Sequence, residues 1–147
     1  PTLRYTHEWL RLYEGRAPVY LYNFKYFTPK AFTWRRFFIP VIGSTHCTEL
    51  AYLIGRPLLF PYEFDETDKR MQRMFTDSFV NFVYFGNPNG PSNSSLPVPW
   101  KPMSRAQPQL HYEFDVEPKL TESYFDGRCW DILRNQGKLL PIFEKLE

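Results

Sequence analysis

The sequence predicts an α/β protein, because helical and extended patterns follow one another along the chain. Residues 5–14 place aromatic and aliphatic side chains three and four positions apart, as on one face of a helix. Residues 19–24 form a nearly unbroken run of β-branched and aromatic residues, which is typical of a strand buried on both faces. Residues 109–115 alternate between apolar and polar side chains, which predicts a half-buried edge strand.

The first two elements form a predicted αβ unit. The apolar face of the first helix consists of Tyr5, Trp9, Leu12 and Tyr13. Gly15 ends this helix, and Ala17-Pro18 turns the chain into the strand at residues 19–24. Residues 25–36 are mixed aromatic and basic with Pro29 inside, so we predict a loop that either lines a pocket or is solvated.

A second, longer helix is predicted to begin at Asp65 or Thr67 and to end at Gly86. Its apolar stripe has members three and four positions apart: Met71, Met74, Phe75, Ser78, Phe79 and Phe82. We interpret this stripe as core packing and not as a cofactor or lipid groove. Glycine and prolines interrupt residues 50–64, which we expect to form short irregular pieces.

The rest of the chain carries turn signals, a strand and a final helix. Residues 86–95 are rich in Gly, Asn, Pro and Ser, and Asn93 begins a glycosylation sequon, Asn-Ser-Ser. The strand at residues 109–115 follows. The last predicted helix places one apolar face after residue 121, formed by Tyr124, Cys129, Ile132 and Leu133.

Composition excludes several classes of function. The 18 basic and 16 acidic residues are dispersed and give a net charge of +2, so the chain lacks the basic stripe that a nucleic acid requires. No apolar run approaches the ~18 residues of a membrane span. The two cysteines and three histidines are scattered without metal-ligand spacing, so we expect no metal site. The 147 residues suffice, by length, for one ordinary domain.

One stretch of the chain suggests chemistry: an apolar segment that runs through a Gly-Ser-Thr turn to His46 and then to Glu49. Taken alone, a histidine in such a loop is more often structural than catalytic. The pattern Gly43-x-x-His46-x-x-Glu49-Leu50, however, continues into Ile54-Gly55-Arg56-Pro57-Leu58. Together these residues resemble the histidine loop of the type-B carboxylesterases and cholinesterases, which are α/β-hydrolases.

Other segments resemble the same family in the same order. They are the strand Val19–Phe24, Phe79-Val80-Asn81-Phe82 with Gly86-Asn87-Pro88-Asn89-Gly90, Trp100-Lys101-Pro102 with the strand ending in Phe114, and the helix with Cys129-Trp130. The resemblance therefore covers nearly the whole chain. It implies that residues 1–147 are the C-terminal part of an α/β-hydrolase domain, an incomplete fold with one central strand, a histidine loop, a long helix, edge strands and a C-terminal helix. Because the chain begins with Pro1, we expect residue 1 not to be the natural start.

The resemblance implies a role for each residue of the stretch. A serine hydroxyl needs a base that removes its proton as it attacks an ester carbonyl, and in this family that base is the histidine matched by His46. Glu49 matches an acidic position that we interpret as support for the loop and not as the triad acid. Phe38 and Thr48 are candidates for a pocket rim.

The nucleophile and the triad acid are expected elsewhere. No Gly-x-Ser-x-Gly elbow occurs in the 147 residues, and the glycine-rich oxyanion loop is absent as well. The implied partners are a small ester substrate and the missing N-terminal part of the same domain, with no cofactor. The resemblance also implies a secreted, lumenal or cell-surface glycoprotein.

Two alternatives stay open. The position after the histidine is commonly glycine in the family and is Cys47 here, which is a subgroup trait or the mark of a member without hydrolysis, such as the neuroligin-like adhesion proteins. A free-standing, aromatic-rich binding module is the third interpretation. We disfavour Cys47 as a nucleophile, because neighbouring side chains in an extended segment point apart.

Overall fold

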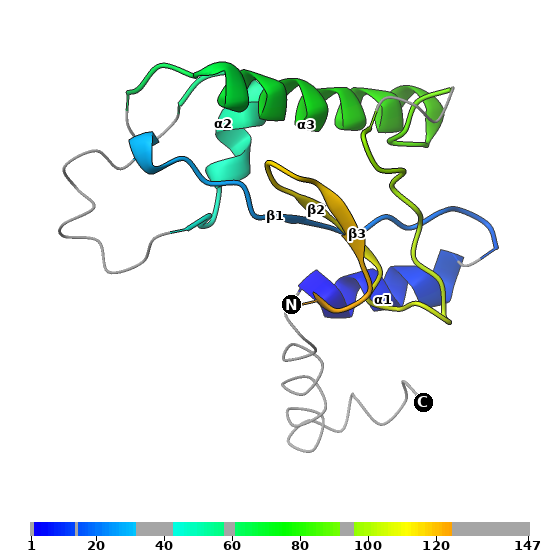
Figure 1. Cartoon of the computed structure of the whole chain (residues 1–147). Coiled ribbons are helices and arrows are strands. Elements are labelled where there is room, and N and C mark those ends of the chain that lie inside the picture. Colours follow the sequence, from blue (N-terminus) through cyan, green and yellow to red (C-terminus); the bar gives the residue numbers. More distant parts are fainter. Residues whose placement is uncertain (1, 14, 32–42, 58–60, 92–95, 125–147) are drawn as a thin grey trace, which may run out of the picture. The chain divides into compact units, whose positions relative to one another are not determined.

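A computed structural model describes residues 2–13, 15–31, 43–57, 61–91 and 96–124. Its elements, in chain order, are α1 (Thr2–Tyr13), β1 (Tyr22–Phe24), the 3₁₀ turn η1 (Pro29–Ala31), α2 (Thr48–Ile54), α3 (Glu66–Phe85), β2 (His111–Phe114) and β3 (Lys119–Thr121). Figure 1 shows these elements along the chain. The chain divides into two compact units, one of residues 1–21, 101–111 and 121–147, the other of residues 22–100 and 112–120.

The strands form a three-stranded sheet in the order β1-β2-β3. β1 pairs with β2 in parallel, with Tyr22 opposite Tyr112 and Phe24 opposite Phe114. The predicted strand at residues 19–24 is thus confirmed only for its second half. The prediction of an edge strand at 109–115 is wrong for this sheet, since β2 lies between the other two strands and all four of its residues are buried.

The core of the second unit is aromatic. Phe75 of α3 meets the rings of Tyr22, Phe24 and Phe114 at centroid distances of 5.7, 5.1 and 5.0 Å. Two of these three contacts are edge-to-face at 66° and the third at 87°, the arrangement that aromatic quadrupoles favour. α3 is therefore held against the face of β1 and β2.

Helix α3 begins and ends as the sequence predicts. Asp65 is its N-cap, and its side chain accepts hydrogen bonds from the backbone amides of Thr67 and Asp68. Gly86 ends the helix with a φ of 65°, which glycine adopts without strain. The predicted apolar stripe is buried from Met71 through Ser78, whereas Phe82 is 45% exposed and does not belong to the described core.

The turn after α3 is also confirmed as far as it is described. The buried Asn89 side chain donates to the Trp100 carbonyl at 2.9 Å and accepts from the Trp100 amide at 2.7 Å. The side-chain amide of Asn89 thus provides the backbone of Trp100 with the two hydrogen bonds that a neighbouring strand would otherwise provide. Residues 92–95, with Asn93, and the predicted C-terminal helix beyond residue 124 lie outside the described residues.

The first unit contains α1, and its buried side differs from the predicted one. Leu10 is buried against Leu21 and Met103, while the four side chains of the predicted apolar face are exposed. These are Tyr5, Trp9, Leu12 and Tyr13. The Met103 amide donates to the Val19 carbonyl at 2.8 Å, and this backbone contact brings the partners of Leu10 together.

Candidate functional site

The candidate site is a tight turn of four residues, Thr45 to Thr48. The Thr48 amide donates to the Thr45 carbonyl at 3.1 Å, which closes a β-turn with His46 and Cys47 at its centre. Cys47 has φ 67° and ψ 8°, and among the described non-glycine residues it alone has a positive φ. These angles are those of the third residue of a type II turn. His46 therefore occupies the corner of the turn, where its side chain is exposed.

Two threonine hydroxyl groups hold this turn. The Thr45 amide donates to the Thr48 hydroxyl oxygen at 2.9 Å, and the two hydroxyl oxygens lie 3.2 Å apart. The bond to the amide adds a second link between the two residues that flank His46 and Cys47. The sequence signal for this arrangement is a hydroxyl residue three positions after another, as Thr48 is after Thr45.

The conformation of Cys47 corrects one expectation. We expected an extended segment at this position, whereas Cys47 lies in the left-handed region that favours glycine. The turn requires this backbone conformation whichever residue occupies the position, so Cys47 retains a geometry for which glycine is the least strained choice. The strain on an ordinary side chain there is about 1 kcal/mol.

The turn leads directly into α2, a helix that the sequence did not predict. α2 starts at Thr48 and ends at Gly55, whose φ is 81° and whose amide donates to the Ala51 carbonyl. Ala51 and Tyr52 are its buried residues, and Figure 1 shows α2 beside α3, with which it is in contact. A helix of seven residues is only marginally stable by itself, so the stability of α2 comes from this packing. The glycine and prolines of residues 50–64, from which irregular structure was predicted, give no indication of this packing.

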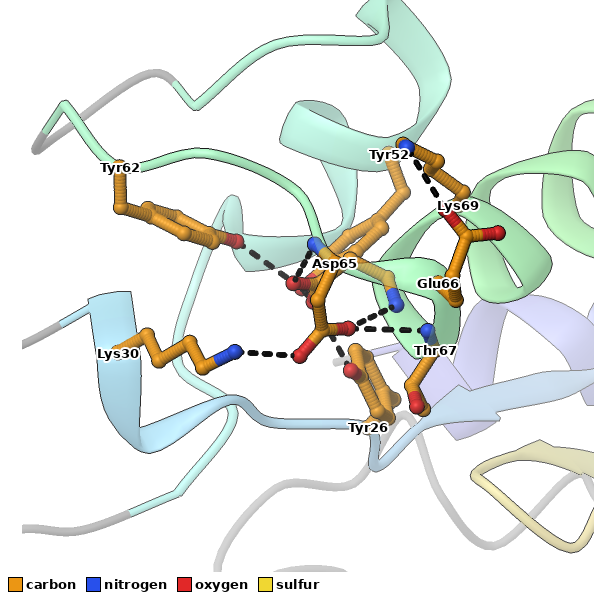
Figure 2. A network of polar contacts seen from close by, with 9 residues as sticks. Tyr26, Lys30, Tyr52, Tyr62, Asp65, Glu66, Thr67 and Lys69 are labelled. Atoms are coloured by element: carbon orange, nitrogen blue, oxygen red, sulfur yellow. Dashed lines mark hydrogen bonds and ion pairs between the residues drawn. The ribbon is translucent and has the colours of Figure 1, made fainter.

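Behind α2 lies a buried network of polar side chains (Figure 2). The Tyr52 hydroxyl donates to the Asp68 carboxylate at 3.1 Å and lies 3.2 Å from the Tyr62 hydroxyl. Burial, with the hydrogen bond to Tyr62 and the charge of Asp68, raises the pKa of Tyr52 well above the usual range of a phenol. Its hydroxyl therefore remains protonated and serves as a hydrogen-bond donor at any physiological pH.

The residues predicted to form the site lie as follows. His46 is exposed at the turn, and Thr48 and Glu49 are half-buried in the first turn of α2. The roles assigned to them stay predictions. Phe38 and Asn93 lie outside the described residues. Across the part of the chain that is described, no three His, Cys, Asp or Glu side chains are grouped to hold a metal ion, and no helix is long and apolar enough to cross a membrane.

Two curated relatives match most of this chain. It is 34% identical over 112 residues to the esterase cest-33 of Caenorhabditis elegans, and the match covers 75% of this chain and 20% of that protein. It is 28% identical over 113 residues to the juvenile hormone esterase of Tribolium castaneum, and the match covers 68% of this chain and 17% of that protein. The chain thus spans about a fifth of the length of these relatives.

Solved structures with a similar fold are also esterases. An esterase from Clostridium hathewayi that can hydrolyse aliphatic aromatic polyesters matches with a TM-score of 0.58 and 18% identity, over 82% of this chain and 21% of that one. The carboxylesterase EST55 of Geobacillus stearothermophilus matches with a TM-score of 0.52 and 19% identity, over 82% of this chain and 29% of that one. The partial sheet and its helices thus have the α/β-hydrolase fold, as predicted. Because the profile of the carboxylesterase family matches residues 1–130, the chain belongs to the carboxylesterase family.

Proposed function

We propose that this chain is the C-terminal part of a hydrolase of carboxylic esters and supplies the triad histidine, His46. One observation carries the proposal: His46 is the exposed corner residue of a turn whose two flanking residues are tied by hydroxyl and backbone hydrogen bonds. Such a turn presents an imidazole to a partner group while limiting its movement. Membership of the carboxylesterase family supports the reaction class.

The chemistry needs three groups, of which this chain would provide one. The imidazole of His46 takes the proton of a serine hydroxyl as the serine oxygen attacks the ester carbonyl. It then gives that proton to the departing alcohol, and a water molecule, deprotonated in the same way, releases the acid. The serine and the carboxylate that orients the ring come from the remainder of the full-length protein, since residues 1–147 contain no Gly-x-Ser-x-Gly elbow.

Glu49 has a supporting role in this proposal. It lies in the first turn of α2, where a carboxylate interacts favourably with the positive end of the helix dipole. Stabilising the start of α2 also stabilises the turn that precedes it. Thr48 and Phe38 remain candidates for the rim of the substrate pocket, and the substrate class is a small carboxylic ester.

The test compares two substitutions in the full-length protein with p-nitrophenyl acetate as substrate. His46→Ala should lower kcat/KM by several powers of ten, because a triad member is lost. Glu49→Gln should lower it far less. Residues 1–147 alone should not exceed free imidazole. Equal losses for the two variants, or saturable activity of the isolated chain that depends on His46, would contradict these assignments.

The alternative of a non-catalytic adhesion protein predicts a different result from the same protein. A full-length sequence without Gly-x-Ser-x-Gly, and without turnover in the unsubstituted protein, would favour adhesion. The proposed lumenal or secreted location has its own test, because Asn93 would then carry a glycan. Enzymatic deglycosylation should lower the mass of the wild type by more than that of Asn93→Gln, and an equal loss of mass in the two proteins would oppose a glycan on Asn93.

A further inference from the structure

We propose that Asp68 is a positioning residue for His46, which it reaches through Tyr52 and the helix that follows the histidine turn. The inference rests on the proposed function of His46. It assigns a role to a buried carboxylate in the first turn of α3.

The geometry of Asp68 divides its two oxygens between two tasks. Its side chain is fully buried. Oδ1 accepts hydrogen bonds from the Tyr26 hydroxyl at 2.8 Å and the Tyr52 hydroxyl at 3.1 Å. Oδ2 accepts the Asp65 amide at 3.1 Å and so completes a capping box with the N-cap residue of α3. Figure 2 shows the two phenols converging near the start of α3.

A buried carboxylate is stable only where donors replace its water. Burying a charge without partners costs several kcal/mol, whereas three donors satisfy most of the acceptor sites of a carboxylate. Burial first, and then the hydrogen bond to Asp68, raise the pKa of Tyr26, so this phenol also stays a donor. Asp68 therefore joins three segments through charge-assisted hydrogen bonds: the chain after β1, α2 and the first turn of α3.

The capping role alone does not account for both phenols. A capping box needs one oxygen of the residue at the third helical position, and Oδ2 provides it. Oδ1 is left to hold Tyr26 and Tyr52, which belong to other elements of the fold. The hold on Tyr52 therefore fixes a second element with respect to α3.

Tyr52 connects this carboxylate to the histidine turn. It lies one helical turn after Thr48, so the two residues share a face of α2. Thr48 in turn binds Thr45 on the other side of His46. The Tyr52 carbonyl also accepts the Thr76 hydroxyl of α3 at 3.2 Å. Since α2 is short and begins two positions after His46, any displacement of α2 on α3 moves the imidazole.

The pair Tyr52→Phe and Tyr26→Phe separates positioning from stability. Each variant removes one hydroxyl from the same carboxylate oxygen. Each also keeps the edge-to-face packing of the two rings, whose centroids lie 5.4 Å apart. Only Tyr52 lies on the helix that continues from the histidine turn. In the full-length protein, Tyr52→Phe should lower kcat about tenfold with KM within about twofold, because small misplacements of a catalytic group are costly. Tyr26→Phe should leave kcat within about twofold.

A second pair provides rescue by a conservative variant. Asp68→Asn keeps an acceptor for Tyr52 but turns an amide donor toward the Asp65 amide, so it weakens the cap and preserves the hold on α2. Its kcat per folded molecule, with the folded fraction measured by circular dichroism, should exceed that of Asp68→Ala. Asp68→Ala removes both the acceptor for Tyr52 and the acceptor for the Asp65 amide.

Equal kcat for Tyr52→Phe and Tyr26→Phe, or kcat that simply follows the folded fraction, would overturn the positioning role. His46→Ala, assayed beside these variants, distinguishes the two proposals. If it retains activity, the proposed function fails. If it is inactive while the two phenylalanine variants behave alike, only the role of Asp68 fails.

Discussion

The turn around His46 and the network around Asp68 differ in how they are built. The turn is local: its links join Thr45 to Thr48, its corner residue is exposed, and Cys47 sits in a strained conformation. The network is long-range: it joins residues 26, 52, 62, 65 and 68 around a carboxylate that is fully buried. One region exposes its histidine, and the other buries a carboxylate among hydrogen-bond donors.

This difference shows how a short exposed turn gains rigidity. Local hydrogen bonds in contact with water contribute little net free energy, because water competes for them. Buried, fully satisfied networks are rigid and fix the relative position of the elements they join. A group that must be accessible and precisely placed therefore needs a rigid support behind it. Here α2 is the element that connects the two regions.

The largest effect is expected from a substitution that removes the carboxylate at the centre of the network. Asp68→Ala in the full-length protein should lower the free energy of unfolding by about 3 kcal/mol, because two phenols and one amide lose their acceptor in a buried site. Denaturant titration measures this loss. Asp77→Ala is the matched control, since Asp77 is exposed on the same helix. It should change stability by no more than about 0.5 kcal/mol. Similar losses for both variants would show that the buried contacts of Asp68 contribute little to stability.

The sequence predicted the elements whose signals are local. The cap, apolar stripe and glycine stop of α3 all lie within one segment, and the structure has them at those positions. α2 escaped prediction because its stability comes from the burial of Ala51 and Tyr52 in the fold and from its contact with α3. β2 was predicted as a strand but not as the middle one, because the pairing with β1 on one side and β3 on the other is set by chain topology.

The candidate site divides in the same way. His46 was predicted from a pattern within its own segment, through resemblance to a family, and its role stays a prediction. The contacts of Asp68 with Tyr26 and Tyr52 span 42 and 16 positions, so nothing in the local sequence marks them. An aspartate in the first helical turn is common for its favourable charge alone. Only the fold shows that this one is fully buried.

A smaller effect should relieve the strain of the turn. Cys47→Gly places glycine at a φ of 67°, where the side chain of cysteine is disfavoured, and should raise the free energy of unfolding by about 0.5 to 1 kcal/mol. Thermal unfolding measures the gain. Cys47→Ala is the control, because alanine keeps the Cβ atom and hence the strain. A gain of the same size for alanine would trace the effect to the thiol and not to the backbone.

The smallest effect at neutral pH concerns Asp65, the N-cap residue of α3. The hydrogen bond from Lys30 at 2.6 Å, followed by the amides of Asp68 and Thr67, lowers the pKa of Asp65 from 3.8 to about 2. Asp65 therefore holds its proton less tightly in the folded state than in the unfolded state. The stabilisation of the folded state by ionised Asp65 is fully present above pH 3.8 and is lost as pH falls toward 2.

Asp65→Asn should remove that part of the pH dependence while keeping the cap, since asparagine is an equally good N-cap residue. Near neutral pH the two proteins should unfold at closely similar urea concentrations, because an exposed ion pair contributes little. Between pH 3.8 and 2 the wild type should lose stability more steeply, with a difference approaching about one proton taken up on unfolding. Urea titrations of the full-length protein across this window measure the two slopes. Parallel slopes would mean that the pKa of Asp65 is not lowered in the folded protein.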